Sequence, residues 1–159
     1  MSAGEPRLFP VAQEQLTSDD YYTPAWVFER MGIEFDLDVC SPPGGIPWIP
    51  ARRYFTQADD GLVQSWEGRV WMNCPYSEAW RWVPRFIEHG HGVALLPHAK
   101  SGWHHDIWAA ADGVVNPAQR VNFEGHRSNG EVMFPLFFAA FGEECVEAIG
   151  RLGVVRRIA

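Results

Sequence analysis

The stretch that decides the fold is residues 69–76, Arg-Val-Trp-Met-Asn-Cys-Pro-Tyr. Its first half, Arg69 to Met72, is a short apolar run typical of a buried strand, and its second half, Asn73 to Tyr76, follows without a spacer. In open α/β sheets, ligands bind just beyond the carboxyl ends of the strands. We therefore expect the loop Asn73-Cys74-Pro75-Tyr76 to lie at the functional edge of a sheet.

Helical and strand patterns alternate on both sides of this stretch. Helices are expected from Thr23-Pro24, as N-cap and first residue, to Gly32, and over 78–89, with Ser77 as its cap, 103–111 and 143–149. Strands are expected over 33–39, 69–72, 92–96, from 114, over 121–123, 132–141 and 152–155, and residues 41–57 are expected to form an irregular loop. This alternation predicts an α/β fold whose sheet is mostly parallel and covered by helices on both faces.

Length and composition indicate one globular domain. The chain has 159 residues, 47% hydrophobic and 21% charged, which fits a flexible tail over 1–18 and a single domain over 19–159. No apolar run reaches the roughly 18 residues of a membrane span, and the N-terminus has no secretory pattern. The three cysteines show no paired spacing, so we expect a cytoplasmic protein without disulfides or a zinc knuckle.

The net charge of −7 counts against a nucleic-acid partner, because Lys and Arg side chains supply most nonspecific affinity for phosphate. The basic residues are, however, concentrated around the segments with functional patterns: Arg52, Arg53, Arg81, Arg85, Lys100, Arg120 and Arg127. Eight Trp and ten Phe are more than a core of this size requires, so some of them could stack on bases.

Two segments that follow predicted strands have the chemistry of a binding site. In Asn73-Cys74-Pro75-Tyr76, the Asn amide oxygen and the carbonyl before Pro75 can both accept from one NH2 group, while Tyr76 stacks on the ring that carries it. At the end of Asp36-Leu37-Asp38-Val39-Cys40, an acid can accept from an amine or a ribose hydroxyl. Taken singly, the first could equally be a strand-to-helix turn and the second a pair of solvated acids.

The order of four segments resembles a known family. Asn73 to Tyr76 is similar to the (Asn/Asp/Ser)-Pro-Pro-(Tyr/Phe/Trp) motif of amino-methyltransferases, with Cys74 in place of the first Pro. Tyr21 to Pro24 resembles their Tyr-Thr-Pro segment, Asp36 to Cys40 their Asp-containing strand, and Asp60 to Trp66 the segment before the catalytic strand. Over about residues 19–140 the chain resembles the phage-encoded Dam-like DNA N6-adenine methyltransferases.

The resemblance implies a Rossmann-like class I methyltransferase fold and transfer of a methyl group from S-adenosylmethionine to adenine N6 in DNA. Its implied catalytic residues are Asn73, Cys74, Pro75 and Tyr76, and its cofactor-binding residues are Tyr22, Thr23, Pro24, Asp38, Cys40 and Asp60. Tyr22 to Pro24 would lie along the methionine, Asp38 would hold the amino group or the ribose, and Asp60 would bind the adenine amine. Only about 35 residues separate Asp38 from Asn73, which predicts an abbreviated fold.

The implied partner is DNA, bound transiently with the target adenine flipped out of the stack. Substrate contacts are expected from Tyr76, Lys100, Arg120 and Asn122, and sequence discrimination from loops such as 41–54 or 120–130. Neither a membrane nor an obligatory protein partner is expected. Cys74 is not expected to be a nucleophile as in cytosine C5 methyltransferases, because that chemistry requires Pro before Cys.

Three alternatives stay open at this point. The acceptor could be cytosine N4 or RNA adenine, and the fold could be a catalytically degenerate module that binds nucleic acid. A metal-dependent hydrolase could use His98, His104, His105 and Asp106. No metal is expected, because adjacent His residues on a helix diverge by about 100°.

Overall fold

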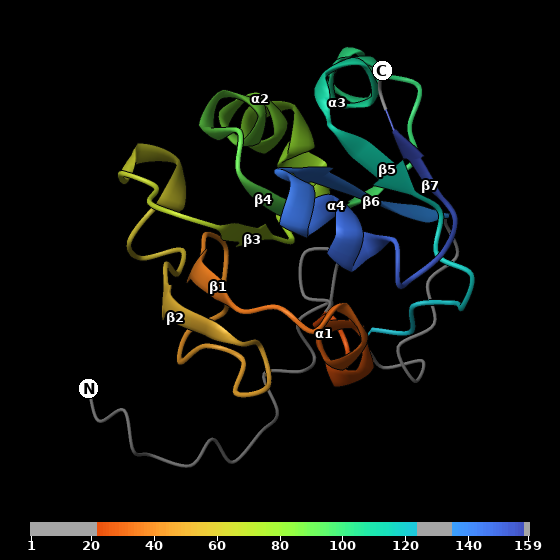
Figure 1. Cartoon of the computed structure of the whole chain (residues 1–159). Helices are drawn as coiled ribbons and strands as arrows, with labels where there is room; N and C mark the ends of the chain where they lie inside the picture. Colours follow the sequence, from red (N-terminus) through yellow and green to blue (C-terminus); the bar gives the residue numbers. More distant parts are fainter. Residues whose placement is uncertain (1–21, 124–134, 158–159) are drawn as a thin grey trace, which may run out of the picture.

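The computed structural model describes residues 22–123 and 135–157, so the predicted tail over 1–18 and Tyr21 lie outside the described residues. Its helices are α1 (Ala25–Met31), α2 (Ala79–His89), α3 (Gly102–Ala110) and α4 (Glu143–Ile149), with short 3-10 helices η3 (Gly61–Val63) and η4 (Tyr76–Glu78). Its strands are β1 (Phe35–Asp38), β2 (Ala51–Tyr54), β3 (Val70–Met72), β4 (Gly92–Pro97), β5 (Gly113–Val115), β6 (Leu136–Phe141) and β7 (Val155–Arg157) (Figure 1).

The seven described strands form one sheet in the order β2-β1-β3-β4-β6-β5-β7. Strand β1 pairs in parallel with β2 and β3, and β3 with β4, whereas β6 pairs antiparallel with β4 and β5, and β7 with β5. The α/β class is confirmed, but the pairing is mixed rather than mostly parallel. The reason is that β6 and β7 run opposite to the other described strands, and an apolar run in the sequence does not indicate the direction of a strand.

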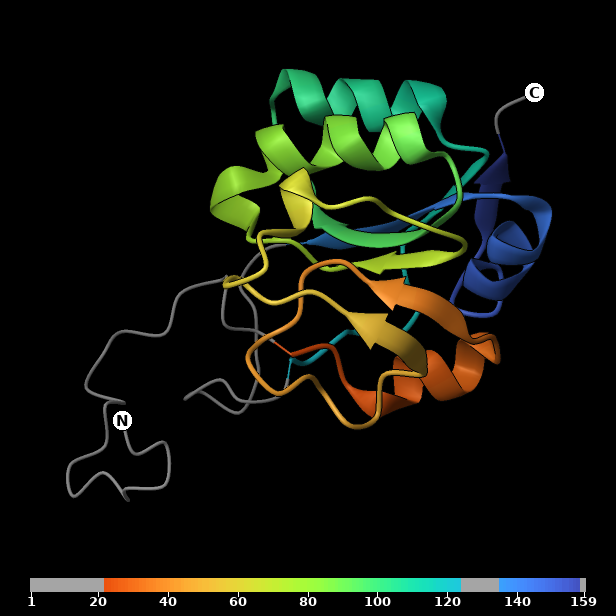
Figure 2. The same ribbon diagram turned by 90° about the vertical axis from the view of Figure 1, so that its left-hand side faces the viewer.

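Helices cover both faces of the sheet, as predicted. The side chains of neighbouring residues in a strand alternate between two apolar clusters. Trp71 and Phe138 belong to the cluster under α1 and α4, whereas Met72 and Phe137 belong to the cluster under α2 and α3. Figure 2 shows α2 and α3 side by side above the sheet and α1 below it. The described part of the chain is thus a three-layer α/β structure.

Three sequence-based boundaries are corrected. The predicted loop 41–57 contains β2, an edge strand whose Arg52, Arg53 and Tyr54 are exposed and therefore lack the apolar alternation that marks a strand. Residues 121–123 form no strand, although Val121 and Phe123 are buried in the core. The last strand begins at Val155 rather than Leu152, and the predicted residues 132–134 of β6 lie outside the described residues.

Two hydroxyl side chains predicted as helix caps have other positions. The N-cap of α1 is Pro24, not Thr23, and Ser77 lies within η4, one turn before α2 begins. The end of α1 is as predicted, because Gly32 adopts a φ of 67° that favours glycine. Thr23 is thereby available to contact the loop after β3 instead.

Of the described helices, none combines the length and the apolar character that crossing a lipid bilayer would require.

Candidate active site

The sheet has a topological switch point between β1 and β3. The chain continues from β1 outward to β2 on one side, and then returns to place β3 on the other side of β1. Such a crossing opens a crevice beyond the carboxyl ends of the two strands, where ligands of α/β proteins bind. A cavity of about 550 Å³ lies there, and its lining includes the predicted residues Tyr22, Asp38, Cys40, Asp60, Asn73 and Pro75.

Asn73 follows β3 directly and is oriented by a residue from the start of the described chain. Its Nδ2 donates to Thr23 Oγ1 at 3.2 Å, and Thr23 is fully buried. The backbone oxygen of Thr23 in turn accepts from Trp48 Nε1 at 2.7 Å. These contacts direct the Asn73 amide oxygen away from Thr23. Thr23 therefore acts on the loop through Asn73 and lies behind the cavity lining.

Asp38 ends β1 and is 3% exposed. Its Oδ1 accepts from the Cys40 backbone N–H at 3.1 Å, and the described residues provide no further hydrogen bond to its side chain. Burial raises the pKa of Asp38 to about 7, against the smaller opposite effect of that hydrogen bond. A buried carboxylate with one donor is suited to receive an ammonium or hydroxyl group from a ligand.

Asp60 reaches the cavity because the next residue packs closely on β1. A Cβ at Gly61 would lie 2.3 Å from the Val39 backbone oxygen and 3.1 Å from the Trp82 ring, so only glycine fits. Asp60 itself has a φ of 56°, and its Oδ1 accepts from Leu62 N at 3.2 Å. The turn is therefore held against the end of β1 with the Asp60 side chain at the cavity.

The remaining residues of the catalytic loop have different surroundings. Pro75 lines the cavity, whereas the Cys74 side chain is buried in the cluster under α2 and α3. Tyr76 packs against both apolar clusters and is not among the cavity-lining residues. Burial raises the pKa of Tyr76 well above its usual value, with Cys74 adding to the effect. The loop thus contributes Asn73 and Pro75 to the cavity lining, whereas the Tyr76 ring packs against the apolar clusters.

The predicted DNA contacts do not join the cavity. Lys100, Arg120 and Asn122 are exposed and lie outside its lining. Lys100 comes shortly after β4, and the other two precede the segment 124–134, which lies outside the described residues. Pro24, which the resemblance placed along the cofactor, is buried next to Thr23 and also does not line the cavity.

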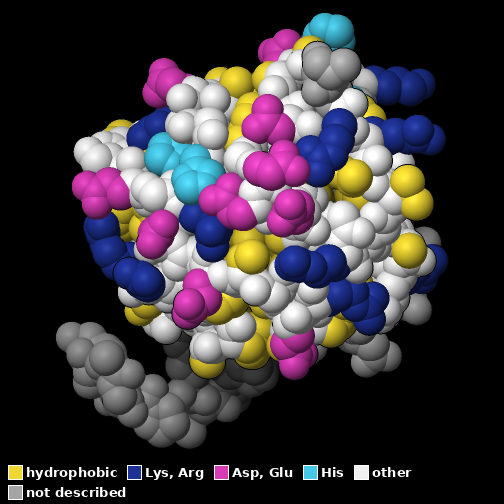
Figure 3. Space-filling view, in the orientation of Figure 1, with side chains coloured by type: hydrophobic (Ala, Val, Ile, Leu, Met, Phe, Trp, Pro, Cys, Tyr) yellow, Lys and Arg dark blue, Asp and Glu magenta, His cyan; other side chains and the backbone are white. Residues whose placement is uncertain are grey.

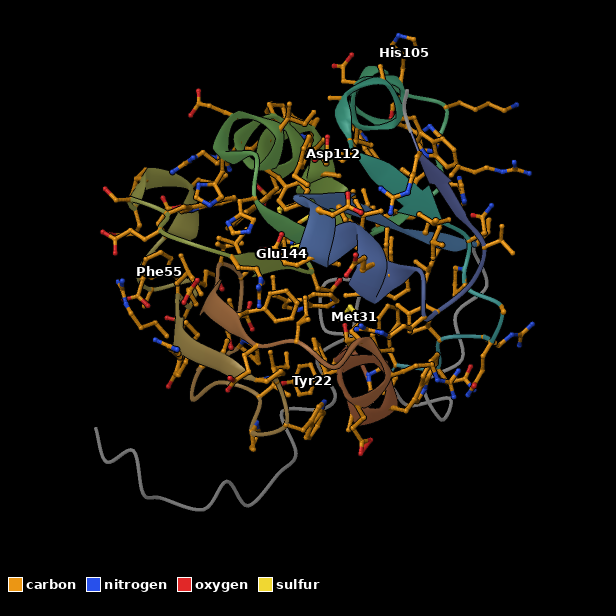
Figure 4. The ribbon with its side chains drawn as sticks, in the orientation of Figure 1. Tyr22, Met31, Phe55, His105, Asp112 and Glu144 are labelled. Carbon is orange, nitrogen blue, oxygen red and sulfur yellow. The ribbon has the colours of Figure 1, made fainter. Side chains whose placement is uncertain are left out.

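The four residues of the alternative metal site do not converge. His98 Nδ1 lies 3.1 Å from His104 Nε2, and His98 Nε2 lies 2.7 Å from Asn116 Oδ1, so these rings are used in hydrogen bonds. Burial lowers the pKa of His104, and His98 contributes further. His105 points outward from α3 (Figure 4), and Asp106 is exposed.

A second polar cluster lies at the amino end of the parallel strands. Glu144 lies in the first turn of α4 (Figure 4). Its Oε2 is 2.9 Å from His91 Nε2 and 3.3 Å from Arg69 Nη2. His91, Glu144 and Cys145 place possible metal ligands within 4.8 Å of one another. The Arg69 guanidinium disfavours a cation there, and burial raises the pKa of the Cys145 thiol to about 12. No local sequence pattern could have predicted this cluster, because its members come from distant segments.

The fold and the cavity together define a class, the α/β proteins with a ligand-sized cavity at the switch point of the sheet. A family model described as DNA N-6-adenine-methyltransferase (Dam) matches residues 12–133, and the chain belongs to this family. It is therefore an adenine-specific DNA methyltransferase that uses S-adenosylmethionine as methyl donor. Neither a curated protein nor a solved structure matches the chain.

Proposed function

We propose that Asn73 Oδ1 and the Cys74 carbonyl accept the two N–H bonds of the target adenine N6. The observation that carries this proposal is the position of Asn73: it follows β3 at the switch point, and Thr23 holds its amide nitrogen. Acceptance of both N–H bonds draws the nitrogen lone pair out of conjugation and aims it at an electrophile. No strong base is needed before the transfer, and the two oxygens stabilise the positive charge that develops on N6.

We further propose that the cavity holds S-adenosylmethionine through Tyr22, Asp38, Cys40 and Asp60, with Thr23 and Pro24 supporting this lining from behind. When bound, the cofactor supplies a methyl group on a sulfonium as the electrophile. Two observations support the fit: Asp38 is buried with one hydrogen-bond donor, and the buried indole N–H of Trp82 has no acceptor among the described residues. Asp38 would accept from the amino group or the ribose, and Asp60 from the adenine amine.

The adenine can contact Asn73 only after it has left the base stack, because the N6 group of a paired and stacked base cannot enter the cavity. Extrusion costs a few kcal/mol, which stacking on Tyr76 would offset. The support for stacking by Tyr76 is the motif alone, because the packing of its ring against both apolar clusters does not itself indicate a stacking role. Catalysis then comes mainly from alignment of the amine with the methyl group.

The fold is proposed to be an abbreviated Rossmann-like class I methyltransferase. The switch point and the order β2-β1-β3-β4 support this, and β2 is the one described strand beyond β1. A single strand beyond β1 is consistent with the short spacing between Asp38 and Asn73.

We also propose a single domain over 19–159 with a tail over 1–18, a phage origin, a cytoplasmic location and a transient complex with DNA. Contacts from Lys100, Arg120 and Asn122 remain part of this proposal.

Two measurements test the assignment. Calorimetric titration with S-adenosylmethionine should show binding that Asp38→Asn weakens and Asn73→Ala leaves intact. Nucleoside mass spectrometry of DNA treated with wild-type protein should show N6-methyladenine, and the Asn73→Ala protein should yield almost none. Full methylation by Asn73→Ala would contradict the proposed role of the loop, and a product on cytosine N4 or only on RNA would contradict the proposed acceptor.

A further inference from the structure

The helix after the catalytic loop presents an unusually exposed aromatic side chain. Ala79, Trp82, Val83 and Phe86 form the buried face of α2. Successive residues of a helix are about 100° apart, so Trp80 points away from this face, and its side chain is 65% exposed. Tryptophan is well buried on average in folded proteins, so this degree of exposure is uncommon for the residue type.

The location of Trp80 relates it to the active site. Helix α2 begins at Ala79, directly after η4 and the catalytic loop, so Trp80 lies in its first turn at the carboxyl edge of the sheet. The neighbouring Arg81 lines the cavity and forms an ion pair of 2.6 Å with Glu78. The Arg81 guanidinium carbon is 6.0 Å from the centroid of the Trp80 ring. The two side chains therefore place a flat aromatic surface and a cation together beside the cavity.

Other exposed apolar side chains are differently placed. Trp48, 37% exposed, donates its Nε1 to Thr23, so it has a role within the fold. Tyr54, 45% exposed, lies on the edge strand β2, Val63, 73% exposed, is an aliphatic side chain at the end of η3, and Val154, 81% exposed, precedes β7. Trp80 thus combines the largest apolar side chain type with a cationic neighbour that borders the cavity.

Acidic side chains lie at both ends of the parallel strands. Three acids, Glu143, Glu144 and Glu147, lie on α4. This helix follows the end of β6, which pairs with Gly92 at the amino end of β4. Figure 3 shows acidic side chains gathered over α4 on that face. The cavity is lined by acids as well, Asp38, Asp60 and Glu78, and Arg81 is the one Lys or Arg among its lining residues. Arg81 is therefore the group that can offer a contact to phosphate beside Trp80.

We propose that Trp80 stacks on a nucleobase of the DNA substrate beside the extruded adenine, and that Arg81 contacts the adjacent phosphate. This inference rests on the DNA methyltransferase activity and adds a binding surface to it. A base next to the extruded adenine loses one stacking partner, and the face of an indole replaces that partner regardless of base identity. Trp80 is thus a positioning residue for DNA and takes no part in binding the cofactor.

The test compares substitutions that separate stacking from apolar contact. KM for DNA and the binding of a fluorescein-labelled duplex that contains a mapped methylation site are measured for Trp80→Ala, Trp80→Leu and Trp80→Phe. We expect Ala and Leu to weaken DNA binding about tenfold and Phe to stay close to wild type, because only Phe keeps a π face. Calorimetry should give an unchanged Kd for S-adenosylmethionine in all three, and Val154→Ala, at an 81% exposed apolar side chain, serves as the control.

Arg81 provides an independent measurement. The slope of log affinity for the duplex against log salt concentration should fall by about one for Arg81→Gln. The slope should stay unchanged for Arg85→Gln, because Arg85, on the same helix, pairs with Glu88. Normal DNA affinity of Trp80→Ala would overturn the proposal. So would Trp80→Leu matching Trp80→Phe, or a dimer that Trp80→Ala converts to monomer, since these indicate a protein contact. A wild-type protein that fails to methylate DNA would instead contradict the activity itself.

Discussion

Asp38 and Glu144 are carboxylates at opposite edges of the sheet, and their surroundings differ in kind. Glu144 is held by His91 and Arg69, which lower its pKa to about 2, with the His91 hydrogen bond as the largest cause. Asp38 is nearly fully buried with one backbone donor, and its pKa is raised to about 7. The chain supplies partners to the first carboxylate and leaves the second for a ligand. Such an imbalance is what distinguishes a binding site from a structural ion pair.

The largest expected effect comes from Asn73→Ala at the cavity edge. We expect kcat to fall about 10²–10³-fold, the range seen when one preorganised polar group at a reacting centre is removed. The Kd for S-adenosylmethionine should change little. Asn116→Ala, at the His98 pair away from the cavity, is the matched control. Single-turnover methylation at the wild-type rate by Asn73→Ala would remove this residue from the mechanism.

Asp38→Asn is expected to have the next largest effect. The amide keeps the shape but loses the charge, so the Kd for S-adenosylmethionine should rise about 10- to 100-fold, as for a buried charged hydrogen bond. Asp36→Asn on the same strand is the control, because its side chain accepts from Arg69 N, away from the cavity. Equal calorimetric affinities for the two variants would contradict the assignment of Asp38.

The pH dependence of the free protein sharpens the comparison. The pKa of Asp38 is about 7 when folded and 3.8 in the unfolded reference, so between these values the unfolded chain gives up a proton that the folded chain keeps. The free energy of unfolding therefore falls as the pH rises from about 4 to 7, by at most about 4 kcal/mol, and this loss is absent in Asp38→Asn. Urea unfolding across this range measures it, and parallel curves for the two proteins would disprove the burial effect. Cofactor affinity should rise over the same range.

Thr23→Val tests the contact that orients the catalytic loop. Loss of the hydroxyl removes the partner of Asn73 Nδ2, so we expect kcat to fall about tenfold, the equivalent of about 1.4 kcal/mol. Thr23→Ser keeps the hydroxyl and should restore most of the rate. If Thr23→Val and Thr23→Ser were equally active, the contact would have no influence on the loop.

Glu144→Gln is expected to affect stability alone. The lowered pKa of Glu144 gives stability that is present above pH 4.5 and is lost as the pH falls through 2. Because its side chain is 41% exposed, solvent screening reduces the contribution to about 1 kcal/mol. Thermal unfolding at neutral pH measures this loss, with Glu147→Gln on the same helix as control. A change in kcat would show that the amino edge is coupled to the cavity.

Local features of the fold were predictable from the sequence. The apolar run before Asn73, the alternation that gives β1, the stop at Gly32 and the span of α4 each depend on neighbouring residues. Edge strand β2 was missed because its exposed residues, Arg52 to Tyr54, show no apolar pattern. The direction of β6 was also unpredictable, since strand polarity depends on the path of the chain before it.

The residues of the candidate site were likewise predictable only in part. The motif around Asn73 indicated the chemistry, and the acid at the end of β1 was recognisable from its position. Lys100 was predicted from its position after a strand, and Arg120 and Asn122 from the resemblance. All three lie outside the cavity lining. Trp80 could not be distinguished from the core aromatics, because only the packed helix reveals which of its residues remain exposed.

The sequence by itself determined which residue types follow each buried strand, and with them the class of reaction, because periodicity and motif are local properties. Only the tertiary structure decided which of these residues meet. Thr23 contacts Asn73 across 50 positions and Arg69 contacts Glu144 across 75, pairings that exist only after the sheet has formed. The same burial that completes the sheet removes Asp38 from water, so the polarity of the site is a property of the fold.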